Sequence, residues 1–189
     1  KKIKIYTSHH THYVIGTGAN DPQKMDPNAS RETLDHSIMY IFAVALEDGS
    51  WHHINSYTPE RANKKSTIDL WKKIVTYEDK KWTKKYHNPN PRKKCFGGEV
   101  IIQMKNGSKI KSKLGVANAH PNGNKPFKRS DYINKFKTLT KNIIDEKESD
   151  RFLNNVQSLR ELGKSELHKL NIKIKSDPRN SSTQNKTIF

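Results

Sequence analysis

Cysteine is almost absent from this chain of 189 residues, which contains only Cys95. One thiol cannot form an internal disulfide, so a small disulfide-stapled fold is excluded. Such sparing use of cysteine is typical of proteins in a reducing compartment, and the first residues do not have the pattern of a secretory signal. We therefore expect a cytoplasmic protein.

Long apolar runs are missing as well. Hydrophobic residues make up 32% of the sequence, and no run approaches the roughly 20 residues that a membrane-spanning helix needs. The sequence therefore predicts no membrane partner. It predicts one domain of ordinary size with a modest core.

Acidic residues are scarce beside basic ones. The chain has 36 Lys and Arg against 19 Asp and Glu, which gives a net charge of +17. A charge of this sign is typical of proteins that bind nucleic acids or other anions. The lysines are spread along the whole chain, however, and no nucleic-acid motif or row of aromatic residues accompanies them. We expect no nucleic-acid partner, and a basic nucleic-acid or anion-binding module remains the alternative from another functional class.

Several familiar site signatures are incomplete. The sequence has no Gly-x-Ser-x-Gly motif for a nucleophile, and Gly16 and Gly18 lack the third glycine of a dinucleotide loop. His10 and His12 would point the same way as alternate residues of a strand and could then chelate a metal. No cysteine or carboxylate lies at ligand spacing from them. We expect no metal and no cofactor, and these histidines could instead donate to an anionic ligand.

Hydrophobic periodicity predicts an α+β fold, with a small, mainly antiparallel sheet packed with helices. Asn106 and Gly107 form the strongest short signal for a hairpin turn. We expect a domain over residues 1–174 and a disordered tail over residues 175–189, which are polar and lack any period. The predicted strands are 2–8, 75–77, 98–104 and 108–117, and the predicted helices are 30–49, 66–74, 79–86, 130–143 and 146–162.

Residues 30–49 form the longest apolar segment and are expected to make one helix that ends at a glycine. Thr33, His36, Ser37 and Tyr40 would share one strip of this mostly buried helix. Its capped start would favour an anion, because free backbone N–H groups and the helix dipole are positive there. From spacing alone, the strip could bind a ligand or could hydrogen-bond inside the protein.

Many positions of the chain match one known family in order, over about residues 2–162. The matching segments are residues 7–49, 51–53, 57–62, 78–87, 96–98, 119–123, 132–136 and 150–152. They resemble the C-terminal domain of the MmgE/PrpD family. Because so many separate positions match, the resemblance is far more specific than any short motif.

The resemblance implies a two-domain, homodimeric enzyme with a larger all-helical N-terminal domain and a smaller α+β lid. Only the lid is matched here. The implied activity is that of a hydro-lyase without an iron–sulfur cluster, which eliminates water from 2-methylcitrate to give 2-methyl-cis-aconitate in the methylcitrate cycle of propionate catabolism. A cis-aconitate decarboxylase or another lyase of the family is the nearest alternative, and the extended match through residues 9–20 favours the dehydratase.

The resemblance also implies a tricarboxylate site between the two domains. The His-Ser-x-x-Tyr motif of the family matches residues 36–40, in the helix expected over residues 30–49. We expect Tyr40 and His36 to be catalytic and Ser37 to bind substrate. The other expected substrate-binding residues are His10, His12 and His120, the last in an Ala-His-Pro loop. Because the chain has no initiator Met and begins inside a strand pattern, we expect a fragment that is inactive without the helical domain.

Overall fold

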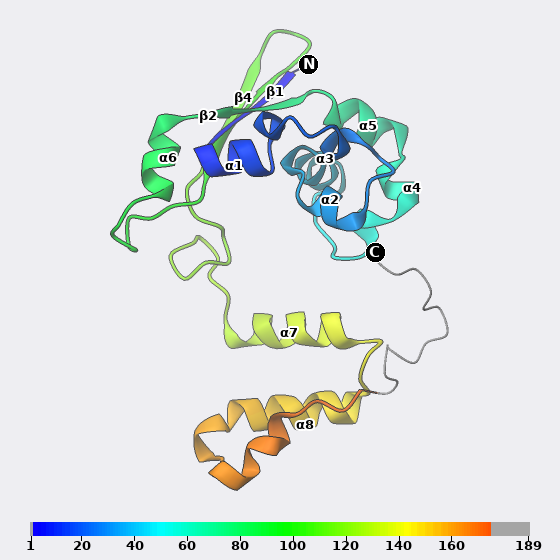
Figure 1. Ribbon diagram of the computed structural model, residues 1–189, viewed down its shortest axis with the longest axis vertical. Helices are drawn as coiled ribbons and strands as arrows, with labels where there is room; N and C mark the ends of the chain where they lie inside the picture. Colours follow the sequence, from blue (N-terminus) through cyan, green and yellow to red (C-terminus); the bar gives the residue numbers. More distant parts are fainter. Residues whose placement is uncertain (1, 175–189) are drawn as a thin grey trace. The chain divides into compact units, whose positions relative to one another are not determined.

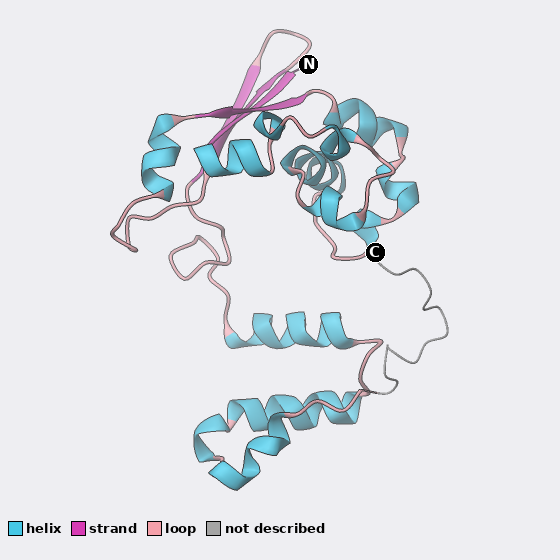
Figure 2. Cartoon of the chain, viewed as in Figure 1, coloured by secondary structure: helices cyan, strands magenta, loops and turns pink. Residues whose placement is uncertain are grey.

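The computed structural model describes residues 2–174, and the tail predicted for residues 175–189 lies outside them. The chain divides into two compact units: unit 1 runs to residue 118 and includes 122–124, and unit 2 comprises 119–121 and the residues from 125 on. No helix within residues 2–174 is long and apolar enough to cross a bilayer. The main elements are β1 (Lys2–Thr7), α1 (His9–Val14), α2 (Arg31–Asp35), α3 (Ile38–Asp48), α4 (Pro59–Ala62), α5 (Lys65–Trp71), β2 (Ile74–Glu78), α6 (Lys80–Tyr86), β3 (Gly98–Gln103), β4 (Lys109–Leu114), α7 (Arg129–Thr140) and α8 (Glu146–Gln157), joined by the 3-10 turns η1 (Thr17–Ala19), η2 (Pro22–Met25), η3 (Asn55–Tyr57), η4 (Leu159–Glu161) and η5 (Lys164–Leu170) (Figures 1 and 2).

Unit 1 contains a four-stranded sheet in the order β2-β1-β3-β4. β1 pairs with β2 in parallel, whereas the β1–β3 and β3–β4 pairs are antiparallel. The predicted α+β class is confirmed, with one parallel pair that makes the sheet mixed. Along β1, Ile3 and Ile5 are buried while Lys2 and Lys4 lie on the other face, as the period-two pattern predicts.

The predicted hairpin between β3 and β4 is present. Gly107 takes a positive φ of 85° in its turn, which glycine adopts without steric cost. The Met104 amide donates to the Ser108 carbonyl over 2.8 Å. β4 is an edge strand of the sheet, and all of its residues are exposed.

The core of unit 1 packs α3 and α5 against the sheet. Gly49, with φ 66°, ends α3 at the predicted position. Arg61 of α4 donates to Glu47 over 2.9 Å and to Asp48 over 3.0 Å, which ties the end of α3 to the next helices. The buried core consists of Ile3, Ile5, Leu34, Met39, Tyr40, Ala43, Val44, Ala62, Trp71 and Ile74.

The prediction of one continuous helix over residues 30–49 is wrong. The segment forms α2 and α3, which are separated by His36 and Ser37. The Ile38 amide donates to the Ile15 carbonyl over 2.9 Å instead of continuing the helical ladder, and the Ser37 hydroxyl donates to the Lys24 carbonyl over 2.8 Å. Tertiary hydrogen bonds to the preceding loop therefore replace local ones, and sequence periodicity does not reveal such bonds.

Unit 2 is built from α7, α8 and η5. Phe136 and Phe152 stack with their ring centroids 5.1 Å apart. Arg151 of α8 donates to the Lys169 carbonyl over 2.6 Å, which holds η5 to the helix. Among the described residues of this unit, Ile144 is the one buried apolar side chain, so its core is small.

Candidate functional site

The histidines after β1 lie on a helix, so the prediction that His10 and His12 alternate along a strand is wrong. The Ser8 hydroxyl accepts the Thr11 amide over 3.3 Å and caps α1. Residues two apart on a helix point about 200° apart. His10 and His12 therefore have different neighbours, and the sequence signal for this outcome was Ser8, a good N-cap.

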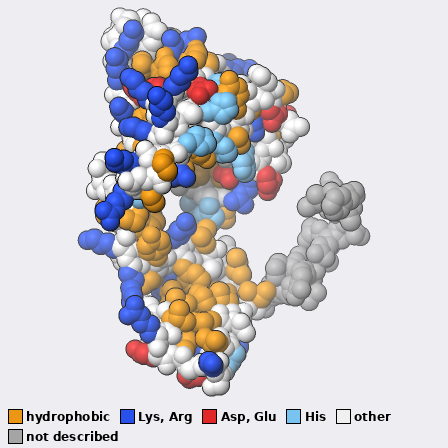
Figure 3. All heavy atoms as spheres, turned by 60° about the vertical axis from the view of Figure 1, so that its left-hand side comes forward, with side chains coloured by type: hydrophobic (Ala, Val, Ile, Leu, Met, Phe, Trp, Pro, Cys, Tyr) orange, Lys and Arg blue, Asp and Glu red, His pale blue; other side chains and the backbone are white. Residues whose placement is uncertain are grey.

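His9 and His10 face side chains from β2 and α6. Nδ1 of His9 lies 3.1 Å from Oε2 of Glu78, and the His10 ring stacks on Tyr86 with the centroids 5.1 Å apart. Figure 3 brings the side of α1 and α6 forward, and histidine side chains gather there. We call His9, His10, Glu78, Thr83 and Tyr86 the α1 surface.

The Glu78 carboxylate in this surface is held at both oxygens. The hydrogen bond from His9 lowers the pKa of Glu78 most, and the hydrogen bond from Thr83 lowers it further. The carboxylate is therefore ionised at neutral pH. Sequence reasoning missed Glu78 and Thr83. The available signal was that Glu78 directly follows a predicted strand. The parallel pairing of that strand with β1, which is distant in the sequence, could not be read from hydrophobic periodicity.

His12 contacts β2 and lies against the loop that follows α1. Its Nδ1 lies 2.7 Å from the Thr76 hydroxyl, and burial lowers the His12 pKa although Glu78 opposes this. The imidazole is therefore neutral at pH 7. A Cβ at Gly16 would lie 2.4 Å from the Thr76 hydroxyl, and one at Gly18 would lie 2.5 Å from the His12 ring. The two glycines thus allow close packing, which accounts for their presence without a phosphate.

Tyr40 lies at the centre of the core and not on a surface. Its side chain is fully buried, and its hydroxyl donates to the Ser56 carbonyl over 2.6 Å. Burial raises the Tyr40 pKa, so the phenol is protonated at neutral pH. In that form it can act as a general acid but not as a general base. The Trp71 ring packs beside it at 5.0 Å.

His36 and Ser37 lie at the break between α2 and α3, in different surroundings. His36 is exposed, and its Nδ1 donates to the Glu32 carbonyl over 2.8 Å. Ser37 is buried and caps α3 by accepting the Tyr40 amide over 3.3 Å. The N-terminus of α2 already carries a carboxylate, Glu32, whose pKa is lowered by hydrogen bonding to the backbone. The predicted strip of four polar groups on one helix is therefore not formed.

His120 is exposed and lies in a turn that belongs to unit 2. The other predicted site residues all belong to unit 1. His10 and His12 share α1, and His36, Ser37 and Tyr40 follow one another around the α2–α3 break.

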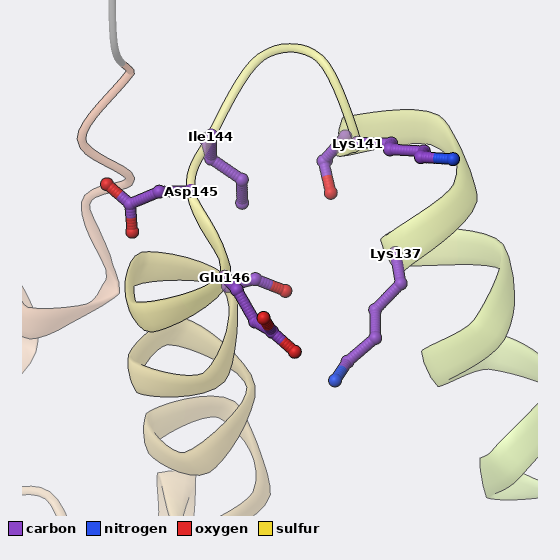
Figure 4. A pocket seen from close by; sticks show the side chains of 7 residues that line it. Lys137, Lys141, Ile144, Asp145 and Glu146 are labelled. Atoms are coloured by element: carbon purple, nitrogen blue, oxygen red, sulfur yellow. The ribbon is translucent and has the colours of Figure 1, made fainter.

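Unit 2 has a cavity of about 290 Å³ where α7 and α8 meet. Lys137 of α7 and Glu146 of α8 extend toward the same space (Figure 4), and Nζ of Lys137 pairs with Asp150 over 2.9 Å. Both signs of charge line the cavity and no predicted site residue does, so it does not resemble a tricarboxylate site. Its lining residues are Lys137, Thr140, Lys141, Ile144, Asp145, Glu146 and Ser149.

Within residues 2–174, no group of three or more His, Cys, Asp or Glu side chains is arranged to hold a metal ion. The side chains that the α1 surface brings together are imidazoles, one fixed carboxylate, a hydroxyl and a phenol. Such groups can transfer protons and bind carboxylates.

Comparison with protein families matches residues 1–161 to the MmgE/PrpD C-terminal domain. This chain belongs to the MmgE/PrpD family. Among curated proteins, it is similar to the 2-methylcitrate dehydratases of Salmonella typhimurium and Salmonella typhi, at 36% identity over 76 residues in each. That match covers 40% of this chain and 15% of each relative. The resemblance predicted from sequence is thereby confirmed for the MmgE/PrpD C-terminal domain.

Proposed function

We propose that this chain is the C-terminal, lid-forming part of an MmgE/PrpD lyase that eliminates water from 2-methylcitrate to give 2-methyl-cis-aconitate. The observation that carries the proposal is the similarity to two 2-methylcitrate dehydratases. The family assignment supports it over most of the chain.

The chemistry of unit 1 agrees with such a reaction. Elimination needs a base for a proton next to a carboxylate and an acid for the departing hydroxyl. The α1 surface offers imidazoles beside an ionised carboxylate. A tricarboxylate also needs N–H donors, which His10 and His12 of unit 1 would supply.

The roles of Tyr40, His36 and Ser37 also belong to the proposal. Tyr40 would act as a proton donor, since its phenol is protonated. Its proton is now donated to Ser56, so this role requires the segment around η3 to move away. Ser37 likewise binds substrate only if it releases the Lys24 carbonyl, whereas His36 is already exposed.

The proposal includes a preceding all-helical domain, a homodimer, a cytoplasmic location, and no activity of the 189 residues alone. A coupled assay of the full-length enzyme with 2-methylcitrate, citrate and cis-aconitate tests it. Dehydration of 2-methylcitrate with the highest kcat/KM is the expected result. Decarboxylation of cis-aconitate instead would assign the chain to another lyase of the family, and turnover by the 189 residues alone would refute the need for a second domain.

Tyr40→Phe in the full-length enzyme tests the proton-donor role. We expect a fall in kcat of at least about 100-fold, the usual scale for a lost acid–base group, with an unchanged far-ultraviolet circular dichroism spectrum. Tyr132→Phe, at an exposed tyrosine of α7, is the matched control. An unchanged rate would mean that Tyr40 is structural.

A second candidate function, anion binding, is favoured by the sheet face opposite the core. Tyr6 and Tyr77 stack there with centroids 5.4 Å apart, beside a hollow of about 190 Å³. Paired aromatic rings among lysines can bind single-stranded nucleic acid. The hollow is lined by Lys2, Lys4, Tyr6, Ile101, Gln103, Lys109 and Lys111.

Fluorescence anisotropy with a labelled single-stranded DNA tests this second candidate. Binding at 50 mM salt that weakens steeply by 200 mM would support it. Lys4→Gln combined with Lys111→Gln should then weaken binding more than Lys135→Gln combined with Lys147→Gln in unit 2. No binding at 50 mM salt would remove this candidate.

A further inference from the structure

His9 and Glu78 are held together more firmly than an ordinary surface pair. Nδ1 of His9 lies 3.1 Å from Oε2 of Glu78. The other carboxylate oxygen, Oε1, accepts from the Thr83 hydroxyl over 3.0 Å. The same hydroxyl accepts the His9 backbone amide over 2.9 Å. Three hydrogen bonds thus join His9, Glu78 and Thr83 in a ring that fixes both the carboxylate and the start of α1.

The sheet topology places this ring of residues at the carboxyl ends of two parallel strands. Thr7, the last residue of β1, is opposite Glu78, the last residue of β2. α1 and α6 begin directly after them. The carboxyl ends of neighbouring parallel strands meet at one sheet edge, where open α/β sheets usually bind their ligands.

The hydrogen bonding defines which nitrogen of His9 carries the proton. A carboxylate can only accept, so Nδ1–H donates to Glu78. In the tautomer that donates from Nδ1, the lone pair is on Nε2. No residue in the described part of the chain hydrogen-bonds Nε2, and the His9 side chain is 57% exposed. His9 therefore presents a proton-accepting atom to a ligand.

We propose that Nε2 of His9 is a proton-transfer group of the lyase reaction and that Glu78 is its positioning residue. This inference rests on the proposed function. In the elimination, the C–H bond next to a carboxylate breaks and its proton passes to Nε2, while the C–O bond breaks as the hydroxyl leaves. The departing hydroxyl takes a proton either from the imidazolium or from Tyr40, and in the second case the His9 proton returns through solvent to the tyrosinate, so one water forms and both side chains regain their starting state. Glu78 holds the ring and balances its transient charge.

The positioning role is tested on the 189-residue chain with ¹⁵N-labelled histidine, by long-range ¹H–¹⁵N correlation at pH 8. We expect His9 to be in the Nδ1–H form in the wild type and in Glu78→Gln, because the amide oxygen still accepts. In Glu78→Ala we expect the Nε2–H form to dominate. Glu60→Ala, the same change on α4, should leave the His9 signals unchanged. The same tautomer in wild type and Glu78→Ala would overturn the positioning role.

The proton-transfer role is tested on the full-length enzyme with 2-methylcitrate. We expect His9→Gln to lower kcat about 100-fold or more, with KM changed by less than about threefold. Glu78→Ala should lie between the wild type and His9→Gln, and Glu78→Gln should recover part of the loss. His53→Gln is the matched control.

Two failures are distinguishable in these kinetics. A wild-type enzyme that dehydrates 2-methylcitrate while His9→Gln keeps full turnover overturns the role of His9 alone. A wild-type enzyme without lyase activity overturns the proposed function, and the proton-transfer role with it.

Discussion

Tyr40 shows how one hydroxyl can serve the fold. Its O–H is fully buried and donates to the Ser56 carbonyl over 2.6 Å. Tyr40→Phe leaves that carbonyl without this donor, and a lost buried hydrogen bond costs about 1–2 kcal/mol of unfolding free energy. We expect this loss in urea denaturation of the 189-residue chain. Tyr132→Phe, at an exposed tyrosine, should change the midpoint little, and an equal effect of the two substitutions would contradict the expectation.

His12 makes stability depend on pH on the acid side of neutrality. Burial lowers its folded pKa below the ordinary value of 6.5. Between that lower pKa and 6.5, the unfolded chain binds more protons than the folded one, so stability falls as the pH falls. The lowered carboxyl pKa of Glu78 acts only below about 4.5. We expect the urea midpoint to fall between pH 7.5 and 5.5.

The His12→Gln variant should show a smaller fall over the same pH range, because it removes this titrating group. His53→Gln, a histidine outside α1, is the control and should keep the wild-type slope. Identical pH profiles for wild type and His12→Gln would refute the assignment to His12.

Among the elements, the break between α2 and α3 depends on Ser37. Its hydroxyl donates to the Lys24 carbonyl and accepts the Tyr40 amide, so Ser37→Ala removes a cap and a buried hydrogen bond. We expect a loss of about 2 kcal/mol, measured by urea denaturation. Ser30→Ala removes the exposed cap of α2 and should cost about 1 kcal/mol or less. A larger effect at Ser30 would show that the tertiary bond of Ser37 contributes little.

The loop after α1 depends on the absence of a side chain at Gly16. A Cβ there would lie 2.4 Å from the Thr76 hydroxyl and 2.7 Å from the His12 carbonyl. We expect Gly16→Ala to lower the melting temperature through a loss of roughly 1–3 kcal/mol, the usual cost of overpacking. At Gly49 a Cβ meets nothing within 4 Å, so Gly49→Ala should cost only the positive-φ penalty of about 1–2 kcal/mol. If Gly16→Ala lost no more than about 1 kcal/mol of unfolding free energy, and no more than Gly49→Ala, the packing role of Gly16 would be refuted.

The sequence predicted elements better than it predicted the partners of side chains. The β3–β4 hairpin followed from Asn106 and Gly107, and Gly49 ended α3 as expected, because both signals are local. The α2–α3 break depends on the Lys24 carbonyl. The Glu78 neighbour of His9 depends on the pairing of β1 with β2, whose partner residues lie 71 positions apart in the chain. Long-range partners of this kind leave no trace in hydrophobic periodicity. For the same reason, Tyr40 could be placed on a buried helix but not matched to Ser56.

For the whole molecule, the two units differ in how much apolar surface they bury. The core cluster belongs to unit 1, whereas Ile144 is the one buried apolar side chain among the described residues of unit 2. Less apolar burial means lower local stability. We expect amides of α7 and α8 to exchange with deuterium about 100-fold or more faster than those of α3, as read by hydrogen-exchange mass spectrometry.

Tryptophan fluorescence provides the independent check on this difference, because Trp51, Trp71 and Trp82 all belong to unit 1. The fluorescence transition in urea should come after the loss of exchange protection in α8. A single coincident transition would show that the two units unfold together.

β1 occupies a central position in the sheet although it is the first strand of the chain. Its neighbours are β2 and β3. Ile3 is paired with Ile74 of β2 on one side and with Ile102 of β3 on the other. During synthesis on the ribosome, β1 emerges long before either neighbour exists. Folding is slow when contacts join distant residues, and a solitary strand with apolar side chains on one face is a target for chaperones. β1 is thus translated before both of its neighbours but can pair with them only later. The sheet can form only after the β3 segment has left the ribosome.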